Sequence, residues 1–264
     1  MKKIFTALIV LTLMLTGCGS SNDKTVKVGT LTQLNSTPEQ AAKISGDEIS
    51  FYDNFNSMQM ALKAQQINSI QTYGIVAKYM SETDADFKIS DEQRTTALTD
   101  NFCLAVREDD VALKNSLDEA INAMKADGTL DEITKKFIRE LKLPPTAVPI
   151  PTFDGARTIR VGVTGDLPPL DLVLADGTPA GFNTAVLAEI AKRLHENIEL
   201  IQLDSAARAT ALTSGEVDAI FWVVVPEDDS RPKNFDTPAG VAVTAPYYQD
   251  IVVNVNLSNL GAGF

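Results

Sequence analysis

Hydrophobic and polar positions follow two alternating periods along the first half of the chain. Short apolar or alternating runs, typical of β-strands, cover Val26–Leu31, Ile49–Tyr52, Ile67–Thr72 and Phe102–Val106. The residues between these runs place apolar side chains three or four positions apart, as an amphipathic helix does. Such βαβα alternation predicts an α/β fold with a mostly parallel sheet covered by helices.

The second half of the chain repeats the same alternation. Strands are predicted at Ile159–Val163, Ile198–Leu203, Val217–Trp222 and Ile251–Val255, and a long amphipathic helix at Thr184–Leu194. The pattern therefore predicts a second α/β unit.

Between the halves lies a proline-rich segment, Leu143–Thr152, with four prolines in ten residues. Proline fixes the backbone in an extended form and cannot donate to a strand or helix, so this segment favours a semi-rigid spacer. We place the main boundary of the chain there.

Two stretches have the pattern of a capped helix start. Thr37 followed by Gln40 predicts a capping box, and Thr129 with Glu132 predicts a second one. The first start follows a strand, so its free backbone N–H groups, with the hydroxyls of Ser36 and Thr37, form a candidate anion site. A helix that is simply capped explains the same residues equally well.

The N-terminus has the features of an export signal. Lys2 and Lys3 precede an apolar run, Ile4–Leu15, which is too short to span a bilayer comfortably. The sequence Leu15–Cys18 then resembles a bacterial lipobox, which implies a signal peptide at 1–17, a lipidated Cys18, a tether at 18–25 and location on the extracytoplasmic face of the cell membrane. An ordinary secretory signal with a chance cysteine is the alternative.

Composition and the remaining cysteine narrow the classes of function. The formal net charge of −12 over 264 residues argues against nucleic acid as a partner, because phosphate neutralisation needs clustered Lys and Arg. Cys103 lies in an apolar strand and is predicted to be a buried thiol. The sole histidine, His195, ends a surface helix, where capping explains it better than catalysis.

Five segments together resemble one protein family. They read V-G-V-T-G-D-L-P-P-L from Val161, A-G-F-N-T-A-V-L-A-E-I-A-K-R-L from Ala180, A-L-T-S-G-E-V-D-A-I from Ala211, A-P-Y-Y from Ala245, and A-M-K-A-D-G-T-L-D-E-I-T-K-K-F-I from Ala123. The chain resembles bacterial extracellular solute-binding protein family 3, the amino-acid type. This resemblance implies a two-lobed, type II periplasmic-binding-protein-like α/β fold with mixed parallel sheets.

The order of these segments differs from the family's usual one. Residues 26–100 resemble lobe 2, residues 101–143 the return hinge strand and terminal helices that pack on lobe 1, and residues 158–256 the front of lobe 1 with a hinge strand. Residues 144–157 would then be a linker and 257–264 a tail. We interpret this as a circular permutation; two half-proteins in tandem that exchange lobes with a second chain are the alternative. A monomer is expected.

The resemblance implies that the two lobes close on a small solute and deliver it to the permease of an ABC transporter. The solute would be amino-acid-like or a small organic acid, including aromatic ones. Matching the family's ligand-binding positions one at a time gives candidates, several of which differ from the family's usual residue types. They are Ser36, Thr37, Tyr73, Asp166, Leu167, Leu170, Arg208, Trp222, Val223 and Arg231.

Two other functions also fit the sequence. A dehydratase-type enzyme on the same fold would use carboxylates in the cleft, although no nucleophile–base pair marks one. A sensory or scaffold lipoprotein would bind without transport. The spacing of His and Cys predicts neither a metal site nor a cofactor site.

Overall fold

The computed structural model describes residues 26–90, 98–227, 229 and 231–258. The predicted signal peptide, Cys18 and almost all of the tether and tail lie outside the described residues.

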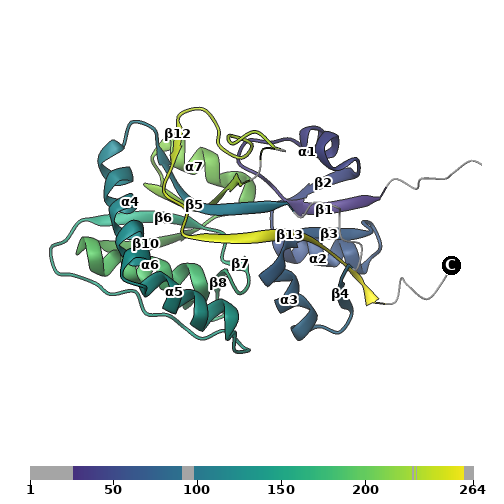
Figure 1. The fold of residues 1–264 in the computed structure, drawn as a ribbon, viewed down its shortest axis with the longest axis horizontal. Helices are drawn as coiled ribbons and strands as arrows, with labels where there is room; N and C mark the ends of the chain where they lie inside the picture. The colour runs from purple at the N-terminus through teal and green to yellow at the C-terminus, as the bar shows by residue number, and fades with distance from the viewer. Residues whose placement is uncertain (1–25, 91–97, 228, 230, 259–264) are drawn as a thin grey trace, which may run out of the picture.

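A ten-stranded mixed sheet runs through the length of the molecule, in the order β10-β6-β11-β5-β13-β3-β1-β2, with β12 paired to β5 and β4 paired to β13 (Figure 1). Its strands are β1 (Lys27–Leu31), β2 (Glu48–Tyr52), β3 (Ser69–Tyr73), β4 (Phe87–Ile89), β5 (Thr99–Arg107), β6 (Thr158–Val163), β10 (Asn197–Gln202), β11 (Ala219–Pro226), β12 (Val241–Val243) and β13 (Tyr248–Leu257). A small second sheet contains β7 (Asp166–Leu167), β8 (Asp171–Val173) and β9 (Pro179–Ala180).

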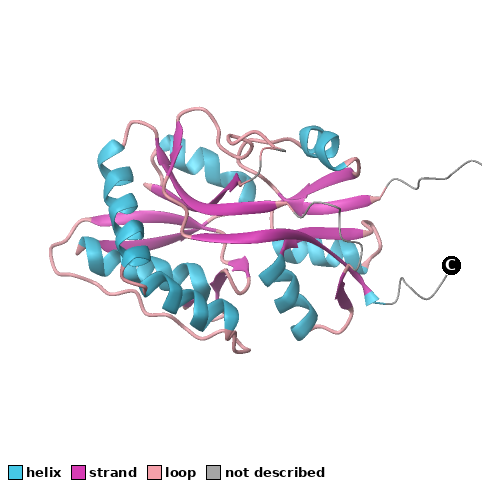
Figure 2. Ribbon diagram, in the orientation of Figure 1, coloured by secondary structure: helices cyan, strands magenta, loops and turns pink. Residues whose placement is uncertain are grey.

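Helices cover both faces of the large sheet (Figure 2). They are α1 (Pro38–Ser45), α2 (Phe55–Lys63), α3 (Gly74–Thr83), α4 (Val111–Ala126), α5 (Thr129–Thr134), the π-helical turn η1 (Lys135–Arg139), α6 (Gly181–Leu194), the 3₁₀ turn η2 (Ser205–Ala207) and α7 (Arg208–Ser214). In the described part of the chain no helix is long and apolar enough to cross a membrane.

The elements form two lobes. We call β1–β4 with α1–α3 the small lobe, and β5–β12 with α4–α7 the large lobe (Figure 1). Strand β13 belongs to both, because its residues Tyr248–Ile251 pair with β5 while Val252–Val255 pair with β3. Along the chain, the lobes are therefore joined by β13 and by the segment between β4 and β5.

The boundary between the lobes is filled with aromatic side chains. The ring of Phe102 lies 4.6 Å from the ring of Tyr73 and 6.0 Å from that of Trp222, centroid to centroid, and 5.4 Å from Tyr248. Offset and edge-on ring pairs at these distances are favourable. One apolar core consequently extends from the small lobe into the large one.

The proline-rich segment and the residues that follow it pack along the large lobe. Val148 N–H donates to the carbonyl of Pro179, and Phe153 N–H donates to the side chain of Asn197, 2.7 Å away. The ring of Phe153 lies 4.2 Å from that of His195, which ends α6 with a left-handed backbone (φ 52°). The residue after the end of a helix often adopts a positive φ. The position of His195 is therefore explained by helix termination.

Most of the strands and helices predicted from the sequence form in the structure, including the capping box of Thr37 and Gln40. The prediction of a second capping box, at Thr129 and Glu132, is wrong. Gly128, with a positive φ of 83°, occupies the cap position, and Thr129 N–H donates to Asp127 instead. The predicted helix at Thr184–Leu194 begins earlier, at Gly181. Cys103 is buried as predicted, and burial raises the pKa of its thiol to about 12.

Candidate functional site

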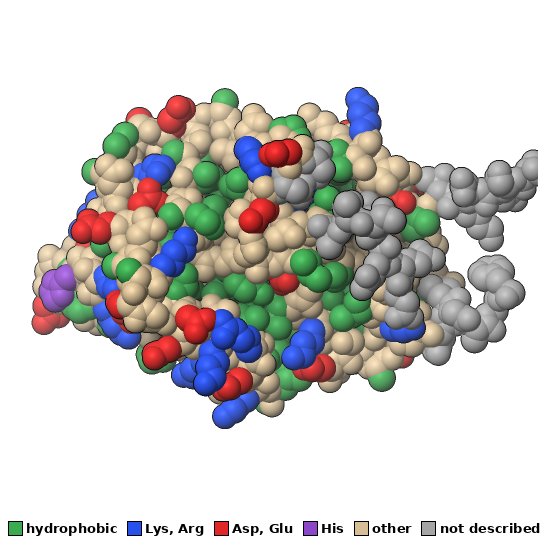
Figure 3. Space-filling model, viewed as in Figure 1, with side chains coloured by type: hydrophobic (Ala, Val, Ile, Leu, Met, Phe, Trp, Pro, Cys, Tyr) green, Lys and Arg blue, Asp and Glu red, His purple; other side chains and the backbone are tan. Residues whose placement is uncertain are grey.

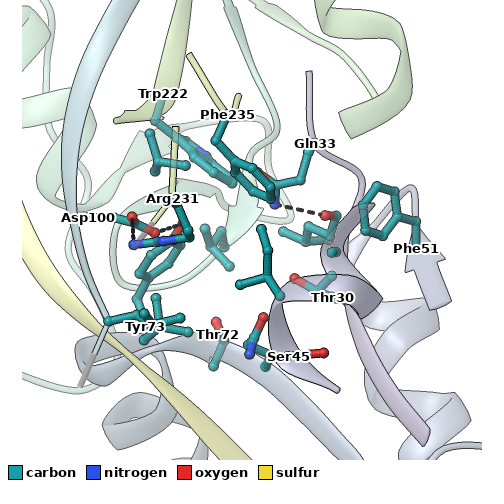
Figure 4. Close-up of a pocket in the computed structure, with 18 residues that line it drawn as sticks. Thr30, Gln33, Ser45, Phe51, Thr72, Tyr73, Asp100, Trp222, Arg231 and Phe235 are labelled. Atoms are coloured by element: carbon teal, nitrogen blue, oxygen red, sulfur yellow. Dashed lines mark hydrogen bonds and ion pairs between the residues drawn. The ribbon is translucent and has the colours of Figure 1, made fainter. Parts of the chain in front are cut away.

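A pocket lies between the two lobes, next to the hinge end of β5 (Figure 4). It contains about 780 Å³ of space without protein atoms, part of it open to solvent. It is lined by Thr30, Leu31, Gln33, Ala41, Ile44, Ser45, Phe51, Gln71, Thr72, Tyr73, Leu98, Asp100, Leu167, Trp222, Val224, Arg231, Phe235 and Val252. Both lobes therefore contribute to one cavity.

Aromatic rings form one wall of this pocket. Tyr73 comes from the end of β3, Trp222 from β11 and Phe235 from the loop after β11. The rings of Tyr73 and Trp222 meet edge to face with centroids 6.2 Å apart, and the Arg208 guanidinium lies 4.5 Å from the centroid of the Trp222 ring. A cation over an indole at this distance is attracted to its face. The wall is thus rigid and apolar toward the pocket.

A buried ion pair lies at the edge of the same wall. Arg231 Nη2 lies 2.7 Å from Asp100 Oδ1, with only 6% and 3% of the two side chains exposed. Arg231 also donates to the carbonyl of Thr99, and the Tyr73 hydroxyl donates to Asp100 at 3.4 Å (Figure 4). Burial, followed by the charge of Asp100, raises the pKa of Tyr73 well above its usual value, so this hydroxyl keeps its proton.

Neutral polar side chains line the pocket from the small lobe. Thr30 comes from β1, while Gln71 and Thr72 come from β3. Their side chains have no hydrogen-bond partner among the described residues, whereas Gln33 donates to the carbonyl of Leu31. Figure 4 shows Thr30 and Thr72 across the pocket from Trp222. The small-lobe wall of the pocket can therefore form hydrogen bonds with a solute through uncharged side chains.

Outside the pocket, a set of hydrogen bonds holds the two lobes together. Arg208 Nη2 donates to the carbonyl of Thr32, 3.1 Å away, and Asp236 accepts from Leu34 N–H. We call these bonds, with the two described next, the cross-lobe contacts. The two lobes are therefore in direct contact beside the pocket, an arrangement that we call the closed form.

The second pair of cross-lobe contacts lies beside α2. Asp166 Oδ2 accepts from Phe55 N–H at 2.7 Å, and Ser205 N–H donates to the carbonyl of Asp53 at 2.9 Å. Phe55 is the first residue of α2, where backbone N–H groups have no partner within the helix. A carboxylate at this end is favourable, because the N-terminus of a helix carries a partial positive charge.

Of the charged members of the cross-lobe contacts, Arg208 and Asp236 are fully buried and Asp166 is partly buried. Burial raises the pKa of Asp236 to about 6, although the neighbouring Arg208 charge and backbone N–H donors act in the opposite direction. Burial likewise raises the pKa of Asp166, and it lowers the pKa of Arg208. Arg208 is satisfied by three backbone carbonyls, those of Ser205, Trp222 and Thr32.

The structure brings some of the predicted site residues into the pocket. Tyr73, Leu167, Trp222 and Arg231 line it. The other six lie elsewhere: Thr37 caps α1, Ser36 is buried beside that cap, Leu170 and Val223 belong to the apolar core, and Asp166 and Arg208 form cross-lobe contacts.

The helix start at Ser36 and Thr37 therefore does not face the pocket, and the hydroxyl of Thr37 is used by its own helix, accepting from Gln40 N–H. Sequence reasoning missed Asp100, Gln71 and Phe235. Asp100 lies in β5, two residues before its apolar run Phe102–Val106, an unusual place for a buried carboxylate, and that signal was available. Nothing in the local pattern marks the other two.

A comparison with protein-family models identifies the fold. The model for bacterial extracellular solute-binding proteins, family 3, matches residues 27–140 and 159–258. The chain belongs to this family. The two matched segments lie on either side of the proline-rich segment, and between them they include both lobes of this family 3 protein. The family and its two-lobed α/β fold, predicted from the motifs, are confirmed.

Solved structures resemble this family 3 protein only distantly, and no curated protein matches it. A ligand-binding component of an ABC-type import system from Staphylococcus aureus with zinc bound is 12% identical, with a TM-score of 0.46, covering 89% of this chain and 67% of that one. A putative L-cystine ABC transporter from Listeria monocytogenes is 13% identical, with a TM-score of 0.41 and coverages of 89% and 83%. Immunogenic lipoprotein A from Vibrio vulnificus is 12% identical, with a TM-score of 0.42 and coverages of 90% and 90%.

Within the described residues, no group of three or more His, Cys, Asp or Glu side chains is arranged to hold a metal ion.

Proposed function

We propose that this protein is a lipid-anchored, extracytoplasmic solute-binding protein that captures a small solute between its lobes for an ABC transporter. The observation that carries the proposal is the pocket itself, which receives walls from both lobes. A solute in it would touch the small lobe and the large lobe at once. Binding energy and lobe closure would then be coupled.

The cross-lobe contacts support this coupling. They involve Thr32, Leu34, Asp53 and Phe55 of the small lobe through backbone atoms alone. Each is a contact that opening of the lobes would break and expose to water. Because hydrogen bonds exchanged with water contribute little net free energy, such contacts allow reversible opening. A bound solute adds the remaining stabilisation of the closed form.

The lipobox-like sequence ending at Cys18 supports the anchor, and the family supports delivery to a permease. The order of the lobes, with the small lobe first, supports a circular permutation whose new ends lie in the small lobe. Lipidation is tested by membrane partition: Cys18→Ser is expected to move the protein from the detergent phase to the aqueous phase. Equal partition of the two forms would contradict the anchor.

Solute capture is tested by a thermal-shift screen of amino acids, small organic acids, sugars and neutral aromatic compounds on the anchor-free Cys18→Ser protein. A ligand at a hundred times its Kd stabilises the folded form by about 2.7 kcal/mol, which gives a clear rise in Tm. Hits are confirmed by titration calorimetry. Phe235→Ala, in the pocket wall, is expected to weaken binding, whereas Met60→Ala, on an exposed surface, is not. If no compound raises the Tm, solute capture is wrong.

A further inference from the structure

Among the described residues, the charged side chains that line the pocket form one pair of opposite charge. Of the pocket-lining residues in the described part of the chain, Asp100 and Arg231 are the ones with charged side chains. Their charges are opposite, their nearest atoms are 2.7 Å apart, and both side chains are almost fully buried. Further bonds hold the pair in place, from the Tyr73 hydroxyl to Asp100 and from Arg231 to the carbonyl of Thr99.

This pairing limits the charge that a solute can bring. A solute with one net charge would add an uncompensated ion to a buried site, and isolated buried ions are strongly unfavourable. A zwitterion would have to separate Asp100 from Arg231 to obtain a partner for each of its own charges. It would exchange one satisfied ion pair for others while losing its own hydration, so its net gain is small. An uncharged solute meets neither penalty.

The other walls indicate what an uncharged solute would look like. The rings of Tyr73, Trp222 and Phe235 line one wall, and those of Tyr73 and Trp222 meet edge to face, so an aromatic ring can pack against them edge-on or offset. On the small-lobe side, Thr30, Gln71 and Thr72 offer hydrogen-bonding groups that have no partner among the described residues. Such groups bind amide, carbonyl or hydroxyl atoms at the edge of a ring.

We propose that the cleft selects an uncharged aromatic solute, and that the pairing of Asp100 with Arg231 keeps either charge from attracting an ion. This inference rests on the proposed function and narrows its solute class. It differs from an amino-acid-like or acidic cargo, for which the pocket would need a cation or an anion not already paired.

Three probes of nearly the same shape test the proposal: benzamide is neutral, benzoate is an anion and benzamidine is a cation at pH 7. Binding to the anchor-free Cys18→Ser protein is measured by ligand-observed NMR and calorimetry, with L-phenylalanine as the zwitterion. Benzamide is expected to bind about tenfold or more tightly than either ion and than L-phenylalanine, because only the ions disturb the balance of buried charge.

Variants of the pair make the test specific. Asp100→Asn removes the negative charge of the pair and keeps Arg231 positive, so benzoate affinity is expected to rise about tenfold relative to benzamide. Arg231→Gln leaves Asp100 negative, so benzamidine affinity is expected to rise instead. Arg139→Gln, which removes an exposed ion pair with Asp131, is the control and is expected to leave the order of the probes unchanged.

The double change of Asp100→Asn with Arg231→Gln keeps the test valid if a single variant fails to fold, since it removes both charges of the pair. It is expected to retain the preference for benzamide. Folding of each variant is checked by its thermal melt. An unchanged order of probes in folded Asp100→Asn and Arg231→Gln would overturn the role of the pair.

The outcomes also distinguish a failure of this inference from a failure of the proposed function. If L-phenylalanine or another free amino acid binds more tightly than benzamide, the solute class is wrong while solute capture stands. If sugars bind and benzamide does not, the aromatic class is wrong in the same way. If no compound of any charge binds, the inference and the proposed function both fail.

Discussion

The two lobes contribute to their shared boundary in different ways. The large lobe contributes mainly charged side chains: Arg208 and Asp236, which are fully buried, and Asp166, which is partly buried. The small lobe contributes backbone atoms at each of these contacts, in the segments 32–34 and 53–55. At these contacts the large lobe therefore relies mainly on side chains and the small lobe on its backbone. Elsewhere two small-lobe side chains also reach the large lobe: the Asn35 amide donates to the carbonyl of Asn234, and the Tyr73 hydroxyl donates to Asp100.

This difference has a consequence for stability. A buried charge has lost its hydration and depends on its partners, whereas a backbone amide can bind water again when the lobes open. Figure 3 shows the contrast with the outer surface, where charged side chains of both signs are spread over the visible face of the large lobe. There, ion pairs such as Lys135–Glu140 are largely exposed and contribute little.

The largest effect is expected from Arg208→Met. The change removes three hydrogen bonds and the positive charge nearest to the buried Asp236, while the methionine fills a similar volume. Breaking a buried charge network in this way costs about 3–5 kcal/mol. The free energy of unfolding in urea measures it. Arg139→Met, at an exposed pair, is the control, with an expected loss below about 1 kcal/mol. Equal losses would contradict the comparison.

A somewhat smaller, pH-dependent effect is expected from Asp236→Asn. The pKa of Asp236 is raised to about 6 in the folded protein, so the folded state binds this proton more tightly than the unfolded state does. The proton's contribution is fully present below about pH 4 and is lost as the pH rises through about 6. Relative to Asp236→Asn, the parent protein is therefore expected to lose about 2–3 kcal/mol of stability between pH 4 and pH 7.

Urea unfolding of both proteins at several pH values measures that difference. Titration of the remaining carboxyl groups occurs in both proteins and cancels when one curve is subtracted from the other. Parallel curves across this range would show that Asp236 is not buried as the closed structure places it.

A third, smaller effect is expected from Asp166→Ala. The change leaves Phe55 N–H, at the start of α2, without its acceptor from the large lobe. One hydrogen bond to a charged group contributes about 1.5–3 kcal/mol to the closed form. Solute affinity is therefore expected to fall by about tenfold or more, with a faster off-rate, both measurable by calorimetry and stopped flow. An unchanged off-rate would mean that this contact does not control opening.

The smallest effect is expected from Asp53→Ala. Asp53 takes part in the boundary through its carbonyl, which alanine retains, and its side chain only accepts an exposed bond from the Thr32 hydroxyl. The change in unfolding free energy is expected to stay within about 0.5 kcal/mol. A loss comparable to that of Asp166→Ala would remove the distinction between the two sides.

The strands and helices were predictable because their periodicity is strong and local. The buried strand Phe102–Val106 and the helix ending at Leu194 needed only their own residues. Short elements such as β4 and β12 were missed, since three residues carry no period. The predicted strand Val217–Trp222 was too short at its end, since β11 continues through the apolar residues Val223–Val225 to Pro226.

The pocket was harder to predict, because its chemistry depends on which distant residues meet. Arg231 was recognised as a candidate, but its partner Asp100 lies 131 positions earlier, and only the fold brings them together. Arg208 was read as a ligand-binding cation for the same reason. Its three backbone acceptors come from separate parts of the chain, and no sequence pattern encodes them. Whether these residues hold a solute stays a prediction.

Strand β13 has one more consequence, which concerns how the chain holds together when it is cut. A break in the proline-rich segment would divide the protein into an N-terminal piece with β1–β5 and a C-terminal piece with β6–β13. Each piece places strands in both lobes: β5 pairs with β11 in the large lobe, and β13 pairs with β3 in the small lobe. The pieces are interwoven, so the molecule is built as a natural split protein, in which two separate polypeptides would have to assemble before either lobe is complete.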